Sequence, residues 1–221
     1  MLTALLTLTL IALPLPGEAP TALPFFGGAA DGPDAAGYVI VPAETTGYAW
    51  IVNEESGVVR GGMRYGFLSS HRFWTRYAGF LRFALNSLPA RTVITSVELD
   101  YYQYYHESGQ PSLIPRAFNY NNTARIMIAR IDSGPPLSSS HVPHDGWNRF
   151  TFGPTGIGIV DSCWYHSRWL AVGFAHVGYG VGHAYGYDAV PQFQPYLRIG
   201  YLTAYPDVGT AMLIEPADTV V

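Results

Sequence analysis

The sequence contains no lysine, a single cysteine and few charged residues. All 12 basic residues are arginine, and charged residues make up 13% of the 221 positions. The lone Cys163 excludes an intrachain disulfide framework and a cysteine-based zinc site. The formal net charge of −4 gives no support to nucleic-acid binding, and the hydrophobic share of 48% excludes an intrinsically disordered chain.

Motifs of nucleophilic, zinc-dependent and phosphate-binding enzymes are also missing. The chain has no G-x-S-x-G, H-E-x-x-H or G-x-x-x-x-G-K. Glu98 and Asp100 share one face of an expected strand, at about the carboxylate separation of an inverting glycosidase. A charged face that deters sheet aggregation is the favoured interpretation of this pair. The sequence predicts that the protein is not an enzyme and uses no cofactor.

What the chain does contain is typical of β-structure. Its 16 Tyr suit half-buried strands, while 24 Gly and 17 Pro punctuate them. In 92–105, residues Val93, Thr95, Val97, Leu99 and Tyr101 alternate with polar positions. Other expected strands are 38–41, 48–52, 72–85, 124–131, 147–152, 169–176 and 196–201. This pattern predicts an all-β, antiparallel, jelly-roll-like sandwich with at most one short helix, at 157–165.

The N-terminus predicts export. Residues 1–13 are apolar, too short to span a bilayer, and small residues follow, so 1–19 is interpreted as a signal peptide. The alternation in 6–10 leaves open a strand donated to a neighbouring subunit. Residues 20–37 are read as a linker, 38–205 as the sandwich domain, and 206–221 as a tail or an extra edge strand. The expected location is secreted or cell-surface.

Several stretches resemble a known family. Residues 79–89 (GFLRFALNSLP), followed by 93–99 (VITSVEL), resemble the core strands of DNRLRE-type β-sandwich domains of bacterial secreted and cell-surface proteins. Residues 169–174 and 195–201 resemble that family's last two strands, although Ala84 replaces its usual Asp. The tyrosine-rich 101–106 and 184–187 resemble a subgroup from large multidomain surface proteins. This resemblance implies a jelly-roll-like accessory or adhesive module.

Aromatic residues supply the candidate ligand-binding positions. A tyrosine offers an apolar ring and a polar tip, which suits a sugar, and arginine forks suit acidic groups. The candidates are Tyr102, Tyr104 and His106 in one stretch, Tyr179, His183, Tyr185 and Tyr187 in a second, and the cations Arg72 and Arg76. Arg82 is a third fork for uronic carboxylates, with a structural role in its family-like strand as the alternative. Packing of the rings against the edge of the sandwich is the alternative interpretation.

Metal binding has weaker support. His141, His144 and Asp145 are competent ligands, but Pro143 lies in a loop and the spacing fits no helix-borne motif. A solvated turn is therefore favoured, and no motif indicates calcium. The sequence as a whole predicts a non-catalytic extracellular module that binds polysaccharide or a cell-envelope polymer. The alternative is a structural subunit of a surface filament, assembled with further copies of itself by strand exchange.

Overall fold

The computed structural model describes residues 36–70 and 73–203. The strands are β1 (Ala36–Val52), β2 (Glu55–Arg60), β3 (Met63–Ser69), β4 (Trp74–Ala84), β5 (Thr92–Glu107), β6 (Ser112–Ala117), β7 (Gly146–Thr151), β8 (Trp169–Val177), β9 (Gly180–Ala184) and β10 (Tyr196–Thr203). The helices are α1 (Ala124–Ser133), α2 (Pro154–His166) and the short 3₁₀ turn η1 (Pro191–Phe193).

All strand pairs are antiparallel, and they follow one hydrogen-bonded path. The order is β2-β1-β10-β5-β9-β3-β4-β8-β6, with β7 added to β5 and a further pairing of β1 with β4. Residues 36–42 of β1 pair with β10, whereas residues 43–52 pair with β4 and β2. Strand β1 therefore passes from one layer of the sandwich to the other, and the register shifts between Ala43 and Thr45 at that crossing. The predicted all-β, antiparallel, sandwich-like architecture is confirmed.

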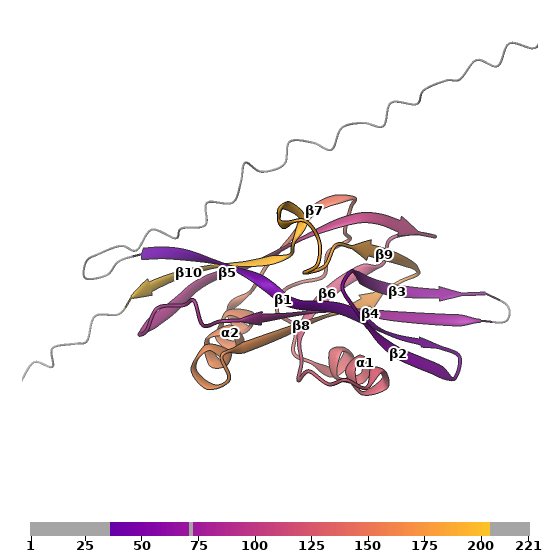
Figure 1. The fold of residues 1–221 in the computed structure, drawn as a ribbon, viewed down its shortest axis with the longest axis horizontal. Coiled ribbons are helices and arrows are strands. Elements are labelled where there is room, and N and C mark those ends of the chain that lie inside the picture. Colours follow the sequence, from indigo (N-terminus) through magenta and orange to yellow (C-terminus); the bar gives the residue numbers. More distant parts are fainter. Residues whose placement is uncertain (1–35, 71–72, 204–221) are drawn as a thin grey trace, which may run out of the picture.

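Two apolar clusters stabilise this arrangement. The larger fills the space between the layers, with Tyr65, Tyr101 and Phe174 fully buried at its centre. The smaller lies outside the sheet, where α1 covers Ala78 and Phe80 of β4. Figure 1 shows α1 below β4 and β8, with β5, β7 and β9 above.

The prediction of at most one short helix is wrong. Residues 124–131, expected as a strand, belong to α1, whose buried residues Ala124, Met127, Ile128 and Ile131 follow the helical spacing of three and four. The expected turn at 157–165 is part of α2, which begins at Pro154 and inserts Val160 and Trp164 into the larger cluster.

The predicted strand at 92–105 is confirmed, but its strict alternation is not. Val97, Leu99 and Tyr101 are fully buried as expected, whereas Val93 is 50% exposed and Ile94 is buried in its place. The register against β10 shifts between Gly200 and Tyr201, opposite Ser96 and Ile94. This bulge adds one residue to β5. On its N-terminal side, residues that strict alternation would place inward therefore face solvent, and their neighbours face the core.

Several N- and C-terminal predictions lie outside the described residues. They are the signal peptide at 1–19, the donated strand at 6–10, most of the linker at 20–37 and the tail at 206–221. Among the described helices, none is long and apolar enough to cross a bilayer.

Candidate functional site

The two tyrosine-rich stretches meet on the outer face of β5 and β9. The ring of Tyr185 lies 4.8 Å from that of Tyr104 and 5.7 Å from that of Tyr102. The amide of Tyr185 also donates a hydrogen bond of 3.0 Å to the carbonyl oxygen of Tyr102. Residues separated by some 80 positions in the chain thus form one continuous group of rings.

A bulge in β5 widens this group. Gln103 pairs with Ala184 and Tyr105 pairs with His183, so Tyr104 is the additional residue. Consecutive strand residues normally face opposite sides of a sheet. Here Tyr104 and Tyr105 are 48% and 51% exposed, and their ring centroids lie 6.1 and 5.3 Å from that of His183. Bulges of this kind re-aim side chains next to functional sites.

The group continues toward β7 and β10. Phe193 stacks on Tyr185 at 5.1 Å and lies 4.7 Å from Tyr102. Trp147 joins Tyr102 to Tyr196, with ring distances of 5.7 and 5.8 Å. We call this continuous set the aromatic surface; it consists of the exposed or half-buried Tyr102, Tyr104, Tyr105, Trp147, Tyr185 and Phe193 and of the buried His183 and Tyr196, which these rings contact.

Arg64 supplies a cation at the edge of the aromatic surface. It pairs across the strands with His183, and its guanidinium lies 5.5 Å from the ring of Tyr48 and 5.8 Å from that of Tyr77. Burial lowers the pKa of His183, and the charge of Arg64 lowers it further. Both effects favour the neutral imidazole. Sequence reasoning missed Arg64, because only the pairing of β3 with β9 brings it beside His183.

A chain of polar contacts runs from the buried Tyr65 and Gln103 to the exposed Asp145 and His106. The hydroxyl of Tyr65 donates to the side-chain oxygen of Gln103, whose amide donates to Asp145 at 2.9 Å. Asp145 also pairs with His106 at 3.2 Å. The hydrogen bond from Gln103 and the contact with His106 lower the pKa of Asp145, despite some opposing burial. His106, a predicted ligand residue, thus anchors the loop before β7 to β5.

The metal candidates do not form a site in the described structure. His141 forms a backbone bridge to Leu113, and a ring nitrogen of His144 lies 2.9 Å from the carbonyl oxygen of Asp145. No group of three potential metal ligands occurs among the described residues.

Tyr179 and Tyr187 make no ring contact with the aromatic surface in the described structure. Tyr179 donates to the carbonyl oxygen of Ser69 at 3.3 Å, at the far end of β9. Tyr187 is 39% exposed, and its amide donates to Thr46 at 2.8 Å. Of the cations proposed from sequence, Arg72 lies outside the described residues. Arg76 forms an ion pair with Asp132 of α1, on the helix-covered face of β4.

His176 lies beside the Arg76–Asp132 pair. Burial, together with the charge of Arg76, lowers its pKa to about 4. His176 binds a proton near pH 6.5 in the unfolded chain and only near pH 4 in the folded chain. Its contribution to the free energy of unfolding is therefore fully present above pH 6.5 and is lost as the pH falls toward 4. We expect the free energy of unfolding to decrease by about 1–2 kcal/mol between pH 7 and 5. Urea unfolding should show a smaller decrease in His176→Gln, and an equal decrease in both proteins would contradict this assignment.

Glu98 and Asp100 are both bound by arginine. Arg149 of β7 contacts Asp100 at 2.8 and 3.2 Å and Glu98 at 3.3 Å. Asp100 is only 3% exposed, and its hydrogen bond raises the pKa of Arg149. These contacts favour a structural role for the two carboxylates, because ion pairing occupies the oxygens that an acid–base catalyst would use.

Removing Arg149 would leave the carboxylate of Asp100 buried without a partner. We expect Arg149→Met to lower the free energy of unfolding by about 2 kcal/mol, less than for a fully buried pair because the guanidinium is half exposed. Chemical denaturation measures this loss. The double variant Asp100→Asn/Arg149→Met should recover part of it, whereas additive losses would contradict the pairing.

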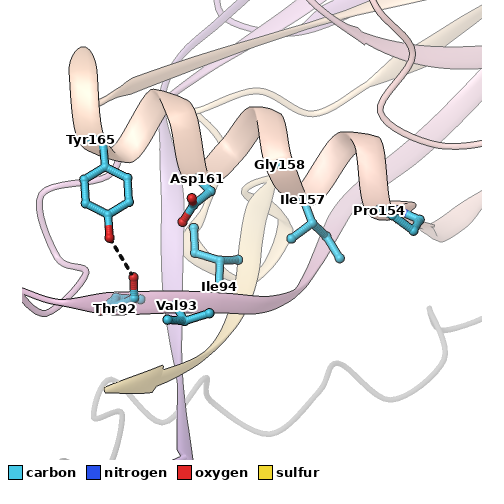
Figure 2. Close-up of a pocket in the computed structure, with 8 residues that line it drawn as sticks. All are labelled: Thr92, Val93, Ile94, Pro154, Ile157, Gly158, Asp161 and Tyr165. Atoms are coloured by element: carbon cyan, nitrogen blue, oxygen red, sulfur yellow. Dashed lines mark hydrogen bonds between the residues drawn. The ribbon is translucent and has the colours of Figure 1, made fainter. Parts of the chain in front are cut away.

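A separate groove of about 420 Å³ lies between α2 and the start of β5. Figure 2 shows Ile157, Asp161 and Tyr165 of α2 facing 92–94, with a hydrogen bond of 3.5 Å between the hydroxyl of Tyr165 and the carbonyl oxygen of Thr92. Asp161 is the only charged side chain among the lining residues. The groove therefore lacks the convergent polar groups that mark a catalytic or ligand-selective pocket.

No family model matches this chain, and no curated protein matches it at a significant level. The resemblance to DNRLRE-type domains stays a prediction.

Proposed function

We propose that this chain is a non-catalytic, extracellular module that binds an extended polysaccharide or cell-envelope polymer across the aromatic surface. The observation that carries the proposal is the bulge at Tyr104. It exposes two consecutive tyrosines on one face, next to the half-buried Tyr185 and Tyr102. Such rings offer flat apolar faces with hydroxyl tips, which complement the faces and hydroxyls of sugar rings.

The packing of the rings supports a preorganised surface. Tyr185 lies between Tyr104 and Phe193, and Phe193 also contacts Tyr102, so each ring is held by its neighbours. The side-chain amide of Gln194 donates to the carbonyl oxygens of Tyr187 and Ala189 at 2.8 and 3.0 Å, which fixes the loop that carries Phe193. A ligand that meets ordered side chains pays a smaller entropic cost on binding.

Retention on polymers tests the proposal. The full-length protein is passed over immobilised cellulose, chitin, xylan and pectate, with and without calcium. Retention on one class, reversed by its soluble form, supports a binding module. Turnover of any retained polymer would contradict the non-catalytic assignment, and absence of retention on every polymer would overturn the proposal.

A structural subunit joined by strand exchange is the second proposal, and the position of β2 favours it. Strand β2 ends the hydrogen-bonded path, so its outer edge has no strand partner among the described residues. An unpaired edge can accept a strand from another chain. Filaments in electron micrographs of the full-length protein would support this function, and a monomer at all concentrations would exclude it.

A further inference from the structure

A second cluster of arginine and aromatic residues lies on the other layer of the sandwich. Helix α1 covers Ala78 and Phe80 on the outer face of β4, and Arg82 continues the same face beyond them. Trp169 of β8 pairs with Ala84, close to the pairing of Ala171 with Arg82. The cluster is therefore remote in the fold from β5 and β9.

The guanidinium of Arg82 is stacked but carries no hydrogen bond in the described structure. It lies 3.9 Å from the ring centroid of Trp169 and 5.6 Å from that of Tyr120. Stacking uses the flat face of a guanidinium and leaves the N–H groups at its edge free. No described acceptor bonds to this edge, which is the part of arginine that binds carboxylate, sulfate and phosphate.

Arg60 brings a second cation to the same tyrosine. One of its nitrogens lies 3.5 Å from the hydroxyl of Tyr120 and 3.5 Å from the side-chain oxygen of Asn122. Both are long hydrogen bonds, and a charged ligand oxygen would form shorter ones. Arg82 contacts the ring of Tyr120 while Arg60 contacts its hydroxyl, so one side chain links the two guanidinium groups.

Neither cation is neutralised. No carboxylate lies within 4 Å of Arg60 or Arg82 among the described ion pairs. Glu44, which precedes the β1 residue opposite Arg82, forms no such pair with them. Arg82 is half-buried, and a cation that has lost part of its water without gaining an anion binds an anion readily.

We propose that Arg60, Arg82, Tyr120 and Trp169 form a binding site for an oxyanion, either a free ion or an acidic group carried by a polymer. The two guanidinium edges bind the charged oxygens, and the indole holds Arg82 in its binding orientation. This site does not depend on the aromatic surface, and either one can fail without the other.

Nuclear magnetic resonance of the full-length protein tests the proposal. The Arg82 Nε–H and Trp169 indole N–H signals are followed as sodium sulfate or trigalacturonate is added at constant ionic strength. We expect saturable shifts of both signals. The affinity, followed at the Trp169 indole N–H, should fall at least tenfold in Arg82→Gln and in Arg60→Gln. Arg60 is exposed, so its variant keeps the test valid if Arg82→Gln fails to fold.

Arg168 provides a matched control. It also stacks on a tryptophan, 3.4 Å from the ring of Trp164, but no second arginine contacts that ring in the described structure. Arg168→Gln should leave the shifts unchanged. Tighter binding of trigalacturonate than of sulfate would assign the site to a polymer-borne acid, and equal binding would assign it to a free oxyanion. Shifts that do not saturate, or that survive in Arg60→Gln, would overturn the proposal.

Discussion

Replacing Tyr104 and Tyr105 together with alanine is expected to lower the affinity for the retained polymer about 100-fold. A well-placed aromatic ring at a binding surface contributes about 1–2 kcal/mol, and every 1.4 kcal/mol is tenfold in affinity. Both rings are about half exposed and lie outside the two apolar clusters, so the melting temperature should change by only a few degrees. Isothermal titration calorimetry with a soluble oligomer of that polymer measures the loss.

Tyr165 is the matched control for this experiment. It is 58% exposed and lies at the groove beside α2, remote from β9. Tyr165→Ala should bind as tightly as the unaltered protein. Equal losses in the Tyr104/Tyr105 and Tyr165 variants, or no loss in either, would remove the aromatic surface from the account.

Gly186→Ala is expected to disrupt both stability and binding. A Cβ at this position would collide with the carbonyl oxygen of Gly61 and with the side-chain oxygen of Thr46. The carbonyl oxygen of Gly61 belongs to the backbone, so it cannot rotate away as a side chain would. The segment that carries Tyr185 and Tyr187 would have to move instead. We expect the free energy of unfolding to fall by about 2–3 kcal/mol, as in an overpacked core, and the affinity to fall at least tenfold because Tyr185 leaves its neighbours.

Gly158→Ala is the control for that substitution. Apart from the chain neighbours and the helix's own backbone, no atom of the described structure lies within 4 Å of a Cβ at Gly158, which is in the middle of α2. Alanine there should stabilise the protein by about 0.5–1 kcal/mol through helix propensity, with unchanged affinity. A Gly186→Ala protein with the unaltered stability and affinity would show that the segment around Tyr185 is not fixed by Thr46.

The strands were predictable because their periodicity is local. Residues 92–105, 147–152, 169–176 and 196–201 all fall within or beside β5, β7, β8 and β10. Helix α1 was also marked in the sequence, since Ala124, Met127, Ile128 and Ile131 have helical spacing. Its short apolar runs were interpreted as a strand, a common ambiguity for segments of this length.

The site was predictable only in part. The two tyrosine-rich stretches were identified from composition, but their junction depends on the long-range pairing of β5 with β9. The exposure of Tyr105 depends on a bulge, which no local pattern in the sequence specifies. Arg64, Trp147 and Phe193 reach the surface through three other elements, β3, β7 and η1. Such contacts follow from tertiary structure alone.

Fluorine resonances of the full-length protein labelled with 3-fluorotyrosine test whether the polymer contacts the aromatic surface. Each signal is assigned with a tyrosine-to-phenylalanine variant, and a soluble oligomer of the retained polymer is then added. We expect the signals of Tyr104, Tyr105 and Tyr185 to shift on binding, and those of Tyr165 and Tyr179 to stay unchanged. Shifts confined to Tyr165, or to tyrosines outside the aromatic surface, would contradict this expectation.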